Sequence, residues 1–235
     1  MAYQLTWLAT TLKRAGLNVV EVQGWQSRGH GDVLATKGVI CHHTAGPKFG
    51  DKPSLDVVVK GRSNLKGPLS QLFLSRDGTY YVVAAGLAWH AGAGMWQGIR
   101  SGNSSFIGIE AENTGLANDM PWPAMQYDAY VQGVAAILER IGQPAIMACG
   151  HKEYASPKGR KSDPTFDMDK FRREVAVLLG HTTSTDQVYV VKDGDGLYAI
   201  ARAHKMRVAD LLAMNNLTLA TVIHPGQKLK VLSPA

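Results

Sequence analysis

The sequence predicts an α/β protein with a mixed central β-sheet flanked by helices, followed by a small βααβ domain. Over roughly the first 180 residues, apolar segments of strand length alternate with segments of helical periodicity. Residues 181–186, HTTSTD, are short and polar and interrupt this pattern. The rest of the chain has the pattern strand, helix, helix, strand. We therefore expect a first domain over residues 1–180, a linker over 181–186 and a second domain over 187–235.

The first domain begins with an expected amphipathic helix, because Leu5, Leu8, Leu12 and Leu17 recur at near-helical spacing. Residues 69–84 predict a hairpin, since two apolar runs flank an Asp-Gly turn. The remaining expected elements are, in order, strands at 38–43, 105–113 and 144–151 and helices at 124–141 and 167–179.

The second domain has a strand, a Gly-rich turn, two short helices, an Asn-rich loop and a closing strand. Its small size predicts a small core and modest stability in isolation.

The chain carries a net charge of +6 and a pI near 9.3, which suits an anionic partner. The basic residues are scattered, so we expect no nucleic-acid partner. No apolar run is long enough to cross a membrane, and the N-terminus lacks the features of a secretory signal. Two cysteines make no disulfide framework. We therefore expect synthesis in the cytosol and no membrane insertion.

The stretch GVICHHTAG at 38–46 places two adjacent histidines after an apolar run. Neighbouring side chains of a strand point to opposite faces, so one of His42 and His43 can serve a given site. Far along the chain, ACGHKEYASPKGRKSDP supplies His151, Lys161 and Asp163. Two imidazoles and a carboxylate are a natural catalytic zinc set, which leaves a fourth position for an activated water.

The stretches CHHTAG, FIGIEAE and GHKEYASPKGRKSDP, with AWHAG at 88–92, resemble the zinc-dependent N-acetylmuramoyl-L-alanine amidases. This amidase-2 group includes phage lysozyme-like amidases and peptidoglycan recognition proteins, and the resemblance covers roughly residues 30–170. It implies an amidase-2-like fold and the zinc ligands His42, His151 and Asp163. His42 is selected over His43 because the family's ligand precedes a variable residue and then Ser or Thr. Cys149, two residues before His151, is an alternative ligand.

The resemblance also implies that Glu110 is the general base and that Lys161 stabilises the oxyanion. Glu112, on the same strand face as Glu110, is an alternative base. Several relatives have a tyrosine or histidine just before the strand that leads to the RDG turn, where this chain has Leu69-Ser70-Gln71. The expected substrate contacts are Trp89, His90 and Asn113.

Residues 187–232 resemble a LysM module through YVVKDGDGLYAIA, ADLLAMNNL and IHPGQKLKV. Such modules bind glycans that contain N-acetylglucosamine. The implied groove residues are Asp195, Gly196, Leu197, Asn216, Ile223 and Pro225. In the family a threonine often stands where Gly196 does. A structural alternative is that Asp195 caps the first helix and Asn216 caps a turn.

Together these resemblances imply a phage endolysin that hydrolyses the amide between N-acetylmuramic acid and L-alanine in peptidoglycan. We expect a monomer that accumulates in the host cytoplasm and reaches the cell wall when the membrane is permeabilised. The alternatives are a non-catalytic peptidoglycan-binding protein and a zinc peptidase that cuts the stem peptide.

Overall fold

The structure of the chain, a computed structural model, describes residues 3–180, 186–204, 206, 208–219 and 221–232. The chain divides into two compact units, Met1–Leu179 and Gly180–Ala235. Most of the expected linker, residues 181–185, lies outside the described residues, and Asp186 is the first residue of a strand.

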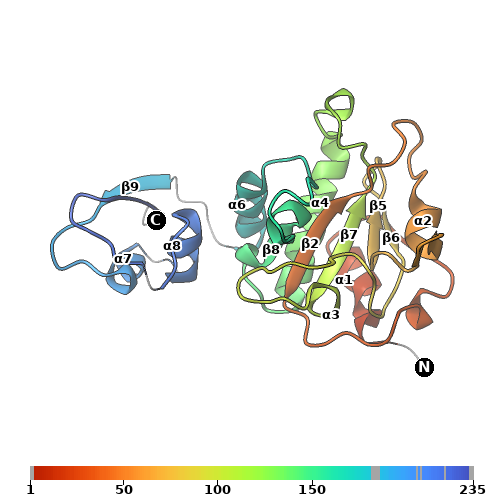
Figure 1. Cartoon of the computed structure of the whole chain (residues 1–235), viewed down its shortest axis with the longest axis horizontal. Helices are drawn as coiled ribbons and strands as arrows, with labels where there is room; N and C mark the ends of the chain where they lie inside the picture. Colours follow the sequence, from red (N-terminus) through yellow and green to blue (C-terminus); the bar gives the residue numbers. More distant parts are fainter. Residues whose placement is uncertain (1–2, 181–185, 205, 207, 220, 233–235) are drawn as a thin grey trace. The chain divides into compact units, whose positions relative to one another are not determined.

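A six-stranded mixed sheet forms the centre of the first unit (Figure 1). Four neighbouring strands, β5, β7, β2 and β8, run parallel, and β6 pairs antiparallel to β5. The carboxyl ends of β2, β7 and β8 therefore meet at one edge of the sheet. In sheet order the strands are β1 (Val19–Glu21), β6 (Tyr80–Val82), β5 (Leu72–Leu74), β7 (Phe106–Ala111), β2 (Gly38–His43) and β8 (Ala148–Gly150).

Three helices, α1 (Leu8–Arg14), α4 (Ala124–Arg140) and α6 (Met168–Leu178), cover one face of this sheet, and α4 contacts both of the others. Their apolar stripes and the strands share the main core. On the other side, α2 (Leu55–Lys60) packs a smaller core against Phe73.

The fold class expected from the sequence is confirmed, as are the strand at 38–43, the hairpin at 69–84 and the helix at 124–141. The expected N-terminal helix is a 3₁₀ turn, Gln4–Trp7, continued by α1, and it ends before Leu17. Sequence analysis missed several short elements: β1, η2 (Trp25–Ser27), α2, the β3–β4 hairpin (Gly61–Arg62 and Leu65–Lys66), α3 (Gly102–Ser105), η3 (Ala117–Asp119), η4 (Ala145–Met147) and α5 (His151–Tyr154).

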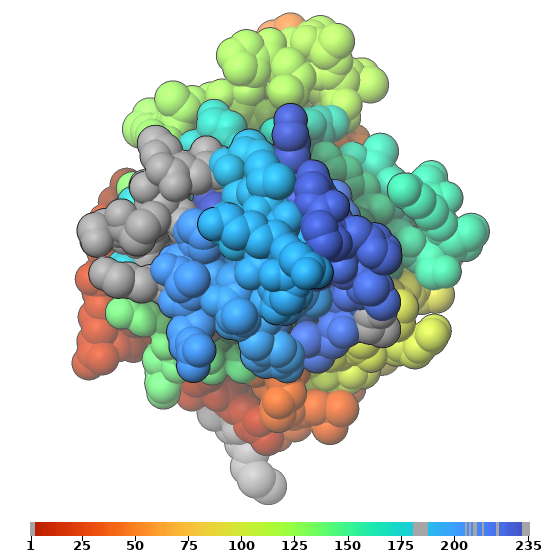
Figure 2. Space-filling view, turned by 90° about the vertical axis from the view of Figure 1, so that its left-hand side faces the viewer, coloured from red at the N-terminus to blue at the C-terminus, as the bar shows by residue number. Residues whose placement is uncertain are grey.

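The second unit has the expected βααβ order, with its own apolar core. Its elements are β9 (Asp186–Val190), α7 (Leu197–Ala203), α8 (Val208–Met214) and β10 (Lys228–Leu232), with the two strands antiparallel. Just beyond β9, the Val191 carbonyl accepts from Gly226 N–H, and Val191 N–H donates to Gln227. These bonds join the loop before α7 to the loop before β10, whose light and dark blue atoms adjoin in Figure 2.

Within the described part of the chain, no helix combines the length and apolar character needed to span a membrane.

Candidate metal centre and active site

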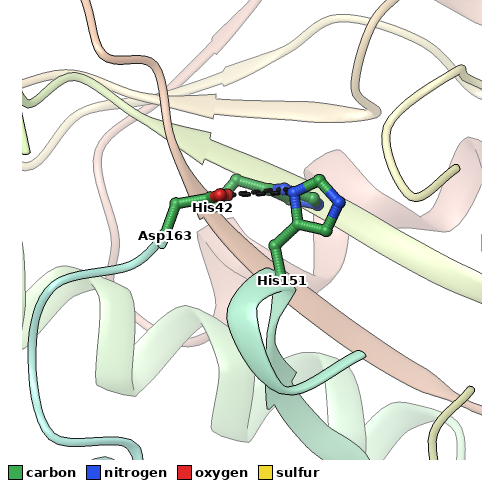
Figure 3. Close-up of side chains that lie close together, drawn as sticks. All are labelled: His42, His151 and Asp163. Atoms are coloured by element: carbon green, nitrogen blue, oxygen red, sulfur yellow. Dashed lines mark hydrogen bonds and ion pairs between the residues drawn. The ribbon is translucent and has the colours of Figure 1, made fainter. Parts of the chain in front are cut away.

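Three side chains from separate segments converge at the carboxyl edge of the parallel strands (Figure 3). His42 lies near the end of β2, His151 begins α5 directly after β8, and Asp163 lies in the following loop. His42 Nδ1 is 3.0 Å from His151 Nδ1 and 3.2 Å from Asp163 Oδ2, and His151 Nδ1 is 3.1 Å from Asp163 Oδ2. Zinc bonds to nitrogen and oxygen of about 2.0–2.2 Å place tetrahedral ligand atoms about 3.3 Å apart, so this spacing fits the ion.

The protonation of these groups also fits a cation. His151 Nε2 is 2.9 Å from the Ala91 carbonyl, which can only accept, so Nε2 carries the proton and Nδ1 presents a lone pair. Burial lowers the pKa of His42 to about 4, so its imidazole is neutral at pH 7. Burial acts to raise the pKa of Asp163, but the adjacent His151 and His42 outweigh it and hold the pKa well below its usual range. Two imidazoles and a carboxylate form a donor set suited to Zn²⁺.

The two alternative ligands lie elsewhere. His43 points to the helix-covered face of the sheet, where its ring centroid is 6.3 Å from that of Trp122. Cys149 is fully buried with its thiol against the Val39 carbonyl. Among the described residues, the cluster able to hold a metal contains neither of them.

Glu110 lies on β7 directly beside His42 in the strand register. Its Oε1 is 4.0 Å from His42 Nδ1, and its Oε2 is buried without a hydrogen-bond partner. Burial and the negative charge of Asp163 raise the pKa of Glu110 to about 8, while Lys161 acts in the opposite direction. A carboxyl group with a pKa near neutrality can both accept and return a proton.

Glu112, the alternative base, has a different environment. It is fully buried, and its carboxylate accepts hydrogen bonds from Thr44 Oγ1 at 2.8 Å, Ser54 N at 2.8 Å and Ser54 Oγ at 2.9 Å. These bonds tie the loop after β2 to the end of β7. Both Glu112 oxygens are therefore occupied, and the geometry favours Glu110 as the base.

Two cations act on Glu110. Lys161 is exposed, and its positive charge lowers the pKa of both Glu110 and His42. Arg62, on β3, also lowers the pKa of Glu110. Sequence analysis did not single out Arg62, because nothing in GRSNLK distinguishes it from an ordinary surface residue.

The expected substrate contacts have three different environments. The Trp89 ring is 39% exposed and stacks on His30 at 4.8 Å, so one aromatic surface remains accessible. His90 is only 7% exposed, and its ring lies against His42. Asn113 is fully buried and bonded within its own loop, to Gly115 N and the Asp119 carbonyl. His90 and Asn113 are thus largely buried in the structure, and their contact with substrate stays a prediction.

The expected groove residues of the second unit also differ from one another in their burial and hydrogen bonding. Asp195 accepts from Tyr189 OH and Lys192 N, both at 2.7 Å. These contacts hold the turn before α7 together, and the helix cap is Gly196, so the expected capping by Asp195 is wrong.

Of the other groove residues, Leu197 is buried and Ile223 packs against the core. Asn216 has a positive φ of 54°, a conformation that asparagine tolerates in turns. Pro225 and Gly196 are exposed.

Comparison with known proteins shows which families the two units resemble. Residues 32–166 match the sequence profile of the N-acetylmuramoyl-L-alanine amidases, over half of the chain. The chain belongs to the N-acetylmuramoyl-L-alanine amidase family. Residues 189–232 match the LysM domain.

The curated relatives include 1,6-anhydro-N-acetylmuramyl-L-alanine amidases named AmpD. The protein of Enterobacter cloacae is 34% identical over 116 residues, which cover 48% of this chain and 57% of the relative. The protein of Escherichia coli K12 is 31% identical over 101 residues, which cover 42% of this chain and 54% of the relative. The chain thus spans about half the length of these relatives. The crystal structure of a selenomethionine AmpD derivative matches with a TM-score of 0.53 at 24% identity, over 74% of this chain and all but 1% of that one.

Gln71 belongs to the segment just before β5, where the family resemblance led us to look for a tyrosine or histidine, and it is fully buried. Its Oε1 accepts from Gly108 N at 2.8 Å, and its Nε2 donates to the Gly86 carbonyl. Gln71 therefore supports the strands and offers no phenol or imidazole to the site.

Proposed function

We propose that this amidase-family chain hydrolyses the amide between the lactyl group of N-acetylmuramic acid and L-alanine in peptidoglycan. We further propose that His42, His151 and Asp163 hold a zinc ion for this reaction. The observation that carries the proposal is the convergence of these three buried donors beside Glu110, whose Oε2 is buried without a hydrogen-bond partner. Family membership supports the bond that is cut, and the donor set supports the metal.

The side chains have distinct roles in this proposal. When bound, zinc would polarise the scissile carbonyl and raise the acidity of water at the site. Glu110 takes a proton from the attacking water and returns it to the amine leaving group, as its pKa near 8 allows. The Lys161 ammonium offsets the negative charge that develops on the carbonyl oxygen.

The second unit would bind the glycan of the same polymer. A catalytic unit tethered to a glycan-binding unit gains effective concentration on an insoluble substrate. The LysM match and the net charge of +6 support attachment to an anionic wall. We propose that the chain acts as a monomeric phage endolysin, which reaches the wall of its host after the membrane is permeabilised.

A second candidate substrate is a soluble 1,6-anhydro-muropeptide. It is favoured by the similarity to the AmpD amidases, which are named for that substrate. The proposed bond is the same, and the difference lies in whether the substrate is polymeric. The LysM match favours the polymer.

Digestion of isolated peptidoglycan followed by mass spectrometry tests the proposal. The expected products are peptides with a free N-terminal L-alanine and glycan with intact muramic acid, released by the wild type and not by Glu110→Gln. New termini inside the stem peptide would identify a peptidase, and wall binding without any cleavage would identify a binding protein. Faster turnover of a soluble 1,6-anhydro-muropeptide than of the polymer would favour the second candidate.

A further inference from the structure

The His90 ring fills a space that is shaped by Gly108 and held by hydrogen bonds to Asn103. His90 belongs to the AWHAG segment between β6 and α3, and the N–H groups of His90 and Ala91 both donate to Asn103 Oδ1, at 2.9 and 2.7 Å. A Cβ atom on Gly108 of β7 would lie 2.6 Å from His90 Cγ. The missing side chain at Gly108 therefore leaves the space that the imidazole fills.

The hydrogen bonds of this ring have a defined direction. His90 Nε2 is 3.2 Å from the Phe106 carbonyl, which can only accept, so Nε2 carries the proton. A neutral imidazole has one donor and one acceptor nitrogen, so with the proton on Nε2 the other nitrogen, Nδ1, is the acceptor. His42 Nε2 lies 3.1 Å from that Nδ1 and is the donor to it.

This direction determines which nitrogen of His42 is free. With its proton on Nε2, neutral His42 presents a lone pair at Nδ1, the atom that faces His151 and Asp163. The neighbouring Ala91 carbonyl fixes the proton of His151 in the same way. Two consecutive residues of one segment thus orient both imidazoles.

We propose that His90 is a positioning residue that fixes the tautomer of His42 and so presents its unprotonated Nδ1 to the metal. The inference rests on the metal site of the proposed function. Without an acceptor at His90, the His42 proton can move to Nδ1, where Asp163 Oδ2 at 3.2 Å accepts it. The ligand atom is then blocked. Loss of such a partner typically weakens metal binding about 10- to 100-fold.

Nitrogen-15 NMR of histidine-labelled, metal-free protein tests the tautomer directly, because protonated and unprotonated ring nitrogens differ in chemical shift. The expected result for the wild type is a proton on Nε2 of His42. A proton on Nδ1 would overturn the proposal. This measurement does not depend on zinc binding, so a failure of the metal proposal remains distinguishable from a failure of this one.

Zinc affinity, measured by competition with a chelator, tests the consequence. We expect His90→Leu to bind zinc about 10- to 100-fold more weakly than the wild type. His90→Asn, whose Oδ1 can accept from His42, should recover most of that loss. Gly108→Ala, which pushes the ring out of the space that it fills, should resemble His90→Leu. Ile107→Val is the matched control in the same strand, since it loosens packing on the opposite face and leaves these bonds intact.

Wild-type affinity in a folded His90→Leu protein would contradict the proposal. So would a loss in His90→Asn as large as that in His90→Leu, since that result would assign the effect to packing alone. If these variants fail to fold, the tautomer of His42 measured by NMR in the wild type still tests the proposal.

Discussion

Glu110 lies on β7 and Glu112 directly follows that strand, and their surroundings separate their roles. Glu112 accepts three hydrogen bonds and joins a loop to the sheet. One oxygen of Glu110 has no partner, although it is buried beside the candidate metal ligands. A buried carboxyl oxygen without a partner is unfavourable for stability, so its presence at this position fits a catalytic role.

The Glu110→Gln variant separates catalysis from metal binding. We expect it to retain zinc, because Glu110 is outside the ligand set, and to lose activity by about 10²- to 10⁴-fold, the usual contribution of a general base. Initial rates on peptidoglycan, measured alongside metal content, provide the test. Glu112→Gln is the comparison variant, and we expect its main effect to be a lower free energy of unfolding. Unchanged turnover in Glu110→Gln would remove Glu110 from the mechanism.

The raised pKa of Glu110 also predicts how stability depends on pH in the metal-free protein. A carboxyl whose pKa is about 8 when folded and ordinary when unfolded favours the folded state below the unfolded pKa. That contribution is lost as the pH rises towards and through about 8. From pH 5 to 9 the free energy of unfolding should therefore fall, by up to about 1.4 kcal/mol per pH unit from this group.

Urea denaturation at pH 5, 7 and 9, with a chelator present, measures this effect. Glu110→Gln cannot ionise and should show a flatter pH dependence than the wild type. Parallel curves for the two proteins would contradict the raised pKa.

Some residues of the candidate site could be predicted from the sequence better than others, and the difference has a physical reason. His42 and Glu110 lie in strands and His151 directly after one, so face alternation limits the possibilities, while Asp163 lies in a loop within the GRKSDP motif. His90 lies in a loop, and a loop residue carries no such signal of where its side chain points. The available clue was Gly108, a residue without a side chain in the middle of an otherwise filled strand.

At the level of elements, α4 supports the site from behind through Tyr130. His42 N–H donates to the buried Tyr130 hydroxyl at 2.9 Å, and the hydroxyl is 2.8 Å from the Ile109 carbonyl. The hydroxyl therefore contacts the backbones of β2 and β7 at the level of the metal ligand. It links the helix-covered face to the position of His42.

Tyr130→Phe should lower the free energy of unfolding by about 1–3 kcal/mol, because it leaves buried backbone groups without a partner. The matched control is Tyr127→Phe, one turn earlier on α4, whose hydroxyl bonds the partly exposed Glu174 and should matter less. Chemical denaturation of both variants gives the comparison. Equal losses of unfolding free energy in the two variants, or no loss in Tyr130→Phe, would argue against a supporting role for the Tyr130 hydroxyl.

The sequence predicted long and strongly patterned elements, and missed short ones. The helix at 124–141 and the strand at 38–43 are long enough for periodicity or continuous burial to stand out. The strand β1 has three residues, none of them fully buried, and α2 has six residues with a single buried one. His151 begins a helical turn where a loop was expected, because four residues are too few to show a period.

At the level of the whole molecule, the described residues of each unit form an apolar core of their own. This separation fits a division of labour between chemistry and attachment. It also allows one function to be removed while the other is kept.

Deleting residues 187–235 should weaken binding to insoluble cell walls and spare hydrolysis of soluble muropeptides. The physical reason is the loss of effective concentration at the polymer, with the catalytic unit intact. Co-sedimentation with purified walls, paired with rates on soluble fragments, measures both quantities. Undiminished sedimentation of the truncated chain would contradict the attachment role.

The measurement that bears most directly on the metal centre is the zinc content of the purified chain after dialysis, determined by elemental mass spectrometry. One zinc ion per wild-type chain is expected, with loss of the ion in both His151→Ala and Asp163→Ala. A wild type that binds no zinc, or variants that keep one ion per chain with normal turnover, would contradict the account.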